Sequence, residues 1–245
     1  MLHNSKLLFW NVVFRFLAGM SAQEEILCTK PTDLGILLDS SDAATINWRE
    51  VLNFANALVD FFNVGPAGRR VGVITYGADA NVAMDFNSLQ GSNLSSDNVK
   101  DLINDLKPTG GPRFIDKALK LANSRLFTHD ARMRDGHDDI LKIIILLTAG
   151  KQTTEQGSFT PLSEASKPLL DKGVGIYVVG VGSKENIDIN ELVQISGRKE
   201  NVLTSKMFKD LVMLAEDLAK VICGMKIIEV SALTYFLAFC ILYIA

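Results

Sequence analysis

The chain has 245 residues, which is long for one domain and short for two. Its 25 basic and 28 acidic residues give a formal net charge of −3. No basic run stands out from this mildly acidic mixture, so the composition argues against nucleic acid as a partner.

Residues 1–22 have the composition of a secretory signal peptide. One basic residue, Lys6, precedes an apolar run over residues 7–16, and small residues lead up to Ala22. A buried first helix is the alternative reading of this segment. A cleaved signal peptide implies that the remaining chain is secreted.

The first predicted strand covers residues 34–38, an apolar run that indicates burial on both faces of a sheet. Apolar residues at helical spacing predict a helix over residues 48–62. A second strand is expected at 70–76. Residues 81–86 follow it too closely for a crossover helix, so we expect them to pair antiparallel with it at the sheet edge.

Strands and helices alternate through the rest of the body. We expect helices at 99–106, 115–122, 162–170, 189–195 and 206–221, and strands at 140–147, 174–181 and 201–203. This alternation predicts an α/β fold: a doubly wound, mainly parallel six-stranded sheet with one antiparallel edge strand and helices on both faces.

The predicted domain comprises residues 23–226, and two cysteines stand at its extremes. In an oxidising compartment Cys28 and Cys223 are expected to form a disulfide that clasps the two ends of the domain; two separate buried thiols are the alternative. Asn93 begins a glycosylation sequon in a polar stretch. The polar segment 129–139 is expected to be a solvated loop.

Residues 227–245 form a hydrophobic C-terminal tail with no charge after residue 229. A terminal apolar run of this length suits a GPI-attachment signal. It is marginal as a membrane-spanning helix, and a core or surface helix is a third alternative. Either of the first two readings places the domain outside the cell.

Three loops should meet at the carboxyl edge of the sheet, where doubly wound folds bind their ligands. They cover residues 39–44, 110–115 and 148–154. The first has no glycine and no Walker lysine, which excludes a nucleotide site. The histidines of the body, His129 and His137, lie in a loop expected to be far from Ser41, which argues against a serine hydrolase.

Several stretches of the body together resemble the von Willebrand factor type A domain, as found in matrilins, collagen VI-type matrix proteins and integrin inserted domains. The resemblance covers about residues 32–221. It is carried by residues 33–41 (DLGILLDSS), Asn47-Trp48, 70–76 (RVGVITY), the glycine pair at 110–111 with DKAL at 116–119, 146–153 (LLTAGKQT) and 175–182 (GIYVVGVG).

The resemblance implies a divalent-metal adhesion site built from Asp-x-Ser-x-Ser, a threonine and a second aspartate. Asp39 and Ser41 match this pattern. The other three positions hold Ala43, Arg113 and Ala149, which supply no oxygen ligand from their side chains. Magnesium needs a nearly complete set of oxygen ligands, so we predict no metal and no cofactor.

Arg113 adds a fixed positive charge that repels a cation. We hypothesise that its guanidinium fills the vacated space and pairs with Asp39; a side chain that points into solvent is the alternative. Asp42, beside these positions, is expected to cap the turn that follows it.

The leading functional expectation is a non-catalytic, secreted or cell-surface protein for adhesion or matrix organisation, with collagens or other matrix proteins as partners. The alternative is a membrane-held receptor or regulatory ectodomain whose tail spans the bilayer. Catalysis is not expected, because no nucleophile, base and orienting group can be placed together.

Overall fold

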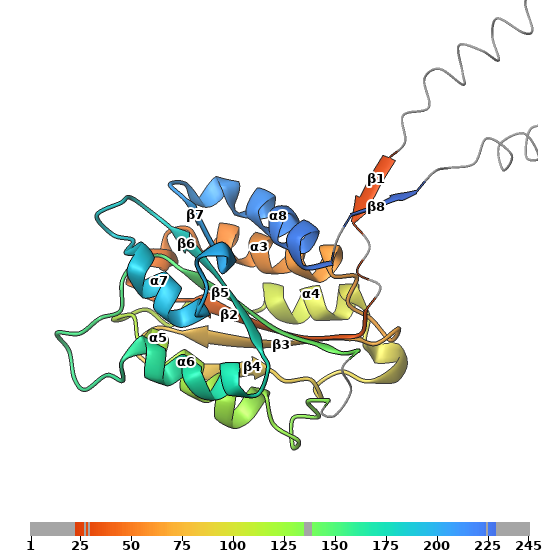
Figure 1. Cartoon of the computed structure of the whole chain (residues 1–245), viewed down its shortest axis with the longest axis horizontal. Coiled ribbons are helices and arrows are strands. Elements are labelled where there is room, and N and C mark those ends of the chain that lie inside the picture. The colour runs from red at the N-terminus through yellow and green to blue at the C-terminus, as the bar shows by residue number, and fades with distance from the viewer. Residues whose placement is uncertain (1–22, 27, 29, 135–138, 224, 229–245) are drawn as a thin grey trace, which may run out of the picture. The chain divides into compact units, whose positions relative to one another are not determined.

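The structure is a computed structural model that describes residues 23–26, 28, 30–134, 139–223 and 225–228 (Figure 1). The chain divides into two compact units, one formed by Met1–Leu27 with Gly224–Ala245 and the other by Cys28–Cys223. The predicted signal peptide and residues 229–245 of the predicted tail lie outside the described residues.

The larger unit is built on a six-stranded sheet with the strand order β4-β3-β2-β5-β6-β7. All neighbouring strands pair parallel except β3 and β4, which pair antiparallel at one edge. The fold prediction is therefore confirmed. The strands are β2 (Thr32–Asp39), β3 (Arg69–Tyr76), β4 (Ala80–Met84), β5 (Leu141–Thr148), β6 (Gly175–Val181) and β7 (Val202–Ser205).

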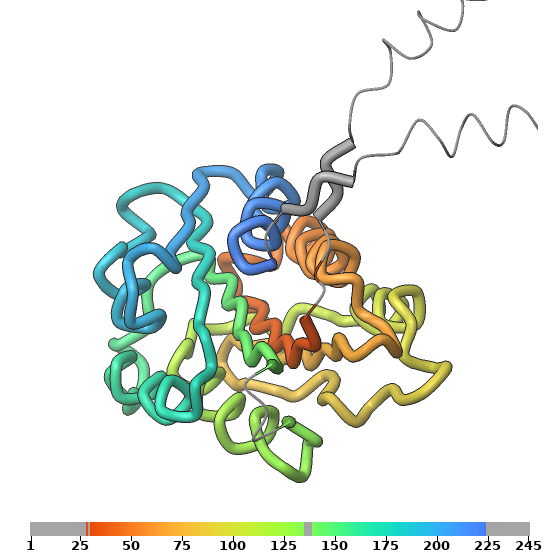
Figure 2. The backbone as a smooth tube through the Cα atoms, turned by 45° about the vertical axis from the view of Figure 1, so that its right-hand side comes forward, coloured from red at the N-terminus to blue at the C-terminus, as the bar shows by residue number. Residues whose placement is uncertain are grey.

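Helices cover both faces of this sheet (Figures 1 and 2). Helix α3 packs against α4 and α8 on one face, and α6 packs against α5 and α7 on the other. The α-helices are α2 (Asp42–Thr45), α3 (Trp48–Phe61), α4 (Ser96–Asn104), α5 (Ile115–Leu121), α6 (Leu162–Asp171), α7 (Ile189–Ser196) and α8 (Leu211–Cys223). Short turns of other helix types are η1 (Gly91–Asn93), η2 (Ala122–Leu126), η3 (Lys199–Asn201) and η4 (Phe208–Asp210).

The core lies between the helices and the central strands. Every residue of β2 is buried, as the continuous apolar run predicted. Glycines bring the end of η2 close to the sheet: a Cβ at Gly72 would lie 2.3 Å from Leu126, and one at Gly35 would lie 2.9 Å from Phe127. Close packing at this point therefore requires glycine on β2 and β3.

The predicted start of the last helix was wrong. Residues 206–210 form a bend and the turn η4, and α8 begins at Leu211. Ser205 explains the delay, because its hydroxyl accepts a hydrogen bond from the Met207 amide and also bonds to Asp210 Oδ2 at 2.8 Å. These side-chain hydrogen bonds compete with the backbone hydrogen bonds that a helix would form here.

The predicted solvated loop at 129–139 is in part docked on the sheet. Arg134 donates to Asp33 Oδ1 from Nη2 at 2.7 Å and to Oδ2 from its backbone amide at 2.9 Å. Arg70 of β3 donates to the same carboxylate, with the shortest contact 2.8 Å. Asp33 is fully buried, so this acid ties the loop to β2 and β3.

A disulfide joins Cys28 to Cys223, the two end residues of the larger unit. In the smaller unit, β1 (Gln23–Ile26) pairs antiparallel with β8 (Met225–Ile228), with Gln23 opposite Ile228. Strand β8 crosses the predicted boundary between residues 226 and 227. Within the described parts of the chain, no helix has the length and hydrophobicity to cross a membrane.

Candidate functional site

The three loops predicted to meet at the carboxyl edge of the sheet are joined by backbone hydrogen bonds. Gly110 N donates to Ser40 O at 2.8 Å, which links the first loop to the second. Thr153 N donates to Arg113 O at 2.9 Å, which links the second loop to the third. The site is therefore one connected structure around the end of β2.

Asp39 lies at the centre of this structure and its side chain is fully buried. Its Oδ1 accepts from Ser41 N at 2.9 Å. Its Oδ2 accepts from Ala149 N at 2.8 Å and from Arg113 Nε at 2.6 Å. The hypothesised pairing of Arg113 with Asp39 is thus present. Each of the three loops contributes one donor to the Asp39 carboxylate.

The Arg113 guanidinium is held from several sides. Its side chain is 11% exposed, and Nη1 donates to Lys151 O at 3.1 Å. The Arg113 backbone amide donates to Thr153 Oγ1 at 2.9 Å. A Cβ on Gly150 would lie 2.4 Å from Nη1, so the guanidinium packs closely against this glycine. This close packing holds the Arg113 guanidinium beside Asp39.

The hydroxyl groups of the first loop differ in their partners. Ser40 Oγ donates to Tyr76 O at 3.0 Å and shares a hydrogen bond with Thr109 Oγ1 at 2.7 Å. Ser41 Oγ is buried and has no hydrogen-bond partner among the residues that the structure describes. A buried hydroxyl without a partner costs free energy of folding, about 1–3 kcal/mol.

Tyr76 lies fully buried at the end of β3 and donates from its hydroxyl to Leu147 O at 2.8 Å. Burial raises the pKa of this phenol well above its usual value, and the nearby Asp39 charge raises it further. Tyr76 is therefore neutral at physiological pH and supports the site by a hydrogen bond to β5.

The remaining positions named from the sequence lie in the first and third loops. Ala43 is exposed in α2, whereas Ala149 is buried and donates a hydrogen bond to Asp39 from its backbone amide. The prediction that Asp42 caps the following turn was wrong. Its Oδ1 accepts from Gly111 N at 2.8 Å, so it joins the first loop to the second.

A buried network beside the site was not predicted from the sequence. Gln152 Oε1 accepts from Ile115 N at 2.7 Å, and Gln152 Nε2 donates to Asp116 Oδ1 at 2.9 Å. The Gln152 backbone amide donates to Glu191 Oε2 at 3.0 Å, which ties the third loop to α7. A polar residue in a loop gives no sign in the sequence that it will be buried.

Glu191 is half-buried in this network. Burial raises the pKa of its carboxyl, the hydrogen bond from Gln152 N opposes that rise, and the charge of Asp188 adds to it. Lys151 and Arg113 lower the pKa of Glu191 by smaller amounts, which indicates that all these charges act on the same edge of the sheet.

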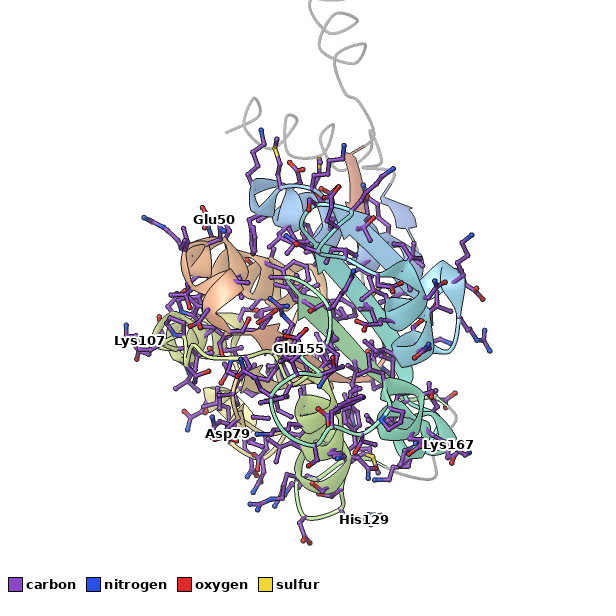
Figure 3. All side chains as sticks on the ribbon, turned by 90° about the vertical axis from the view of Figure 1, so that its left-hand side faces the viewer. Glu50, Asp79, Lys107, His129, Glu155 and Lys167 are labelled. Carbon is purple, nitrogen blue, oxygen red and sulfur yellow. A yellow bond between two sulfur atoms is a disulfide. The ribbon has the colours of Figure 1, made fainter. Side chains whose placement is uncertain are left out.

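Figure 3 looks onto this edge, with Glu155, which directly follows the third loop, near the middle of the view and His129 at its lower end. Among the residues that the structure describes, no three histidine, cysteine, aspartate or glutamate side chains are grouped so as to hold a metal ion. The arrangement holds the internal ion pair between Arg113 and Asp39.

The fold and the loop positions define a doubly wound α/β domain with its loops gathered at the carboxyl edge of the sheet. Residues 33–217 match the von Willebrand factor type A domain, and the chain belongs to this family. The resemblance seen in the sequence is therefore confirmed.

Individual relatives are matrix proteins. The chain is 27% identical to the mouse collagen alpha-1(XX) chain over 201 residues, which cover 80% of this chain and 14% of the collagen. It is 26% identical to human matrilin-1 over 168 residues, which cover 68% of this chain and 32% of the matrilin. The match thus spans a minor part of each of these relatives.

Among solved structures, proximal thread matrix protein 1 from the mussel byssus superposes with a TM-score of 0.71. The two chains are 26% identical, and the match covers 82% of this chain and 49% of the mussel chain. Together these relatives support an extracellular-matrix-associated role and confirm the predicted secreted or extracellular location.

Proposed function

We propose that this chain is a non-catalytic adhesion or matrix-organising protein that binds protein partners without a divalent cation. The single observation that carries the proposal is the ion pair between Arg113 Nε and Asp39 Oδ2 at 2.6 Å, beside two backbone donors to the same carboxylate. The proposal is that this guanidinium, rather than a metal ion, neutralises the Asp39 charge.

The chemistry of magnesium supports this proposal. Magnesium sheds its water reluctantly and is held by carboxylates together with further oxygens in octahedral geometry. Asp39 is the single carboxylate among the five positions of the motif, and Ser41 is the single hydroxyl. A cation at this place would also have to displace the Arg113 charge. Both effects disfavour metal binding.

A solved relative offers the contrast. The mussel byssus protein has been solved with a zinc-occupied MIDAS motif; it is 27% identical and superposes with a TM-score of 0.70. The same fold thus carries a metal there. In this chain we expect Ala43, Arg113 and Ala149 to prevent metal binding.

The decisive experiment is calorimetric titration of the full chain with Mg²⁺ and with Mn²⁺. We expect no saturable heat at millimolar cation. The triple variant Ala43→Ser/Arg113→Thr/Ala149→Asp should gain saturable Mn²⁺ binding, because it restores the missing oxygens and removes the repelling charge. Arg49→Thr, which removes an exposed arginine of α3, is the matched control and should bind no metal.

Thermal unfolding with and without Mn²⁺ provides a second measurement on the same proteins. Ligands that bind the native state raise its stability, so Mn²⁺ should raise the Tm of the triple variant and leave the unaltered chain unchanged. Micromolar binding of Mn²⁺ by the unaltered chain, lost in Asp39→Asn, would contradict the proposal.

The partner class follows from the relatives. We propose that this chain, like the collagens and matrilins it resembles, works among matrix proteins. Plate binding of the purified chain to collagens and other matrix components, with and without EDTA, measures this directly. Binding that EDTA leaves unchanged is expected, and binding abolished by EDTA would oppose the metal-free mechanism.

Two covalent features belong to this extracellular proposal. The disulfide between Cys28 and Cys223 fits an oxidising compartment. Asn93 is exposed in η1, and we propose that it carries an N-linked glycan. We expect the secreted chain to lose mass on glycosidase treatment and Asn93→Gln to lose none. A secreted chain of unchanged mass would contradict glycosylation at Asn93.

A membrane-held receptor or regulatory ectodomain is the second candidate. The observation that favours it is the uncharged run over residues 230–245, which lies outside the described residues. Release of the protein from cells by a phosphatidylinositol-specific phospholipase would indicate a GPI anchor. Retention despite that treatment would indicate a membrane span, and protein in the medium without treatment would indicate simple secretion.

A further inference from the structure

A pocket of about 460 Å³ opens where η2 and α6 end, and it is lined by Phe127, Thr128, His129, Met133 and Lys172. Helix α5, which continues into η2, and helix α6 both start from loops at the carboxyl edge of the sheet, so their ends place this pocket towards the opposite edge. His129 marks its position at the lower end of Figure 3. A volume of this size lies within the range of small-molecule sites, about 300–1,000 Å³.

The backbone around the pocket departs from regular structure at two points. Phe127 N donates to Ala122 O at 2.8 Å, which closes a hydrogen bond over five residues, as in a π-helix. Arg132 has a φ of 62°, in the left-handed region that residues other than glycine rarely adopt. Both features are uncommon in proteins and occur preferentially at functional sites. They favour a binding role for the pocket over incidental space between elements.

Thr128 is held by the turn that forms one wall of the pocket. Its backbone oxygen accepts from Met133 N at 3.0 Å, and its Oγ1 accepts from Ala131 N at 3.2 Å. The hydroxyl proton of Thr128 has no acceptor among the residues that the structure describes. Thr128 can therefore donate a hydrogen bond to a molecule in the pocket.

Lys172 adds a positive charge to the lining. It follows the last residue of α6, and its Nζ donates to Asn123 O and to Phe127 O, each at 3.0 Å. An ammonium carries three donors, so one remains for a ligand. Both of these partners are neutral carbonyls, and the neighbouring Asp171 pairs with Lys167 at 2.9 Å. The charge of Lys172 is therefore available to an anion.

The lining combines these two donors with apolar side chains. Phe127 has its ring centroid 5.4 Å from that of Phe86, edge to face, which fixes its place. Met133 is 7% exposed, and its flexible thioether can adapt to the shape of a ligand. An ammonium and a hydroxyl donor beside apolar groups complement a molecule with an anionic acceptor and an apolar body. Lys172 would repel a cation.

We propose that this pocket binds a small carboxylic acid with an apolar body. The carboxylate accepts hydrogen bonds from Lys172 Nζ and Thr128 Oγ1, and the apolar body lies against Met133 and Phe127. The pocket shares no residue with the three loops around Asp39, and its ligand does not depend on whether a metal binds there.

Calorimetric titration of the full chain with octanoate and with phenylacetate tests this chemistry for an aliphatic and an aromatic acid. We expect saturable binding of at least one of them at millimolar concentration. Acetate, which lacks the apolar body, and octylamine, which carries a cation in place of the anion, should bind at least about tenfold more weakly. If neither acid binds saturably, or if octylamine binds as well as octanoate, the proposal is overturned.

Amide chemical shifts locate the bound acid on the unaltered chain. In ¹⁵N-labelled protein the acid should shift the amide signals of residues 127–133 and 172. The amides of the loops at 39–44 and 148–154 should keep their shifts. Changes concentrated in those two loops would overturn the pocket as the site.

Variants test the role of the charge. Lys172→Gln keeps a donor for the η2 carbonyls but removes the charge, so it should weaken binding of the acid at least about tenfold. Lys172→Arg keeps the charge and should retain binding. The matched control is Lys167→Gln, which removes an exposed lysine of the same helix and should leave binding unchanged. Equal losses in Lys172→Gln and Lys167→Gln would overturn the direct contact. Tm values show whether each variant is folded, and the shift map of the unaltered chain decides the site if Lys172→Gln is not.

Discussion

At the scale of single residues, Arg113 forms an ion pair with the buried Asp39, with Nε 2.6 Å from Oδ2. The pair with Asp39 depends on a close fit, because Gly150 leaves the space in which the guanidinium lies. The sequence indicated the charge and the partner. The role of Gly150 became visible only when the third loop was placed against Arg113.

Gly150→Ala should therefore disturb the ion pair. The added Cβ would lie 2.4 Å from Arg113 Nη1, and such crowding typically costs about 1–3 kcal/mol. We expect the free energy of unfolding in urea to fall by that amount. Gly65→Ala is the control, since its Cβ would meet no atom closer than 3.8 Å, and it should change stability little. Equal stability of the two variants would contradict this account of Gly150.

Glu191 makes the stability of the fold depend on pH. Its pKa is raised above the ordinary value of 4.5, first by burial. Between that value and the raised pKa the folded chain binds more protons than the unfolded chain, so stability falls as pH rises through this interval. The contribution is fully present below pH 4.5 and is lost above the raised pKa.

Glu191→Gln should remove this contribution and keep an oxygen that can accept from Gln152 N. Urea unfolding at a series of pH values from 4 to 7 is the measurement. We expect the stability of the variant relative to the unaltered chain to increase with pH. A difference that stays flat over this range would show that Glu191 does not titrate as proposed.

At the scale of elements, continuous apolar runs and helical spacing predicted strands β2 to β7 and helices α3 to α7 because burial dictates those patterns directly. The start of α8 was missed because Ser205 and Asp210 form local side-chain bonds that compete with helix. The docked part of the segment at 129–139 was missed because its polar composition is that of a solvated loop.

The docking of that segment predicts a stabilising role for Asp33. Asp33→Ala leaves Arg70 and Arg134 without their shared partner, and breaking a buried ion pair from one side costs about 3–5 kcal/mol. We expect a loss of that size in urea unfolding. The control is Asp79→Ala: the exposed pair of Asp79 with Lys117 should contribute less than about 1 kcal/mol. Losses of equal size would refute the role of Asp33.

At the scale of the whole molecule, the disulfide closes the larger unit at its two ends. Cys28 and Cys223 are 195 residues apart in the sequence. A crosslink over so long a loop restricts the unfolded chain strongly, by about 5 kcal/mol in the chain-entropy account. The cysteines could be paired from their positions and the predicted compartment, whereas the β1–β8 ribbon is too short to have been recognised.

Reduction should accordingly destabilise the chain. We expect the free energy of unfolding in urea to fall by about 3–5 kcal/mol when dithiothreitol is added. The urea dependence should become steeper, because the unfolded chain without the crosslink exposes more surface. The variant Cys28→Ala/Cys223→Ala serves as the control, since dithiothreitol should have no effect on its stability. Equal stability of the oxidised and reduced chain would exclude a contribution from this bond.

The sequence by itself determined the family, the order of the strands and helices along the chain, and the loss of three metal-ligand side chains. These features depend on local composition and on residue identity at a few loop positions. The tertiary structure alone decided what fills the site, because the donors to Asp39 come from three loops brought together by the sheet. It also decided that Asp33 anchors a distant loop, since this depends on contacts between segments far apart in the chain.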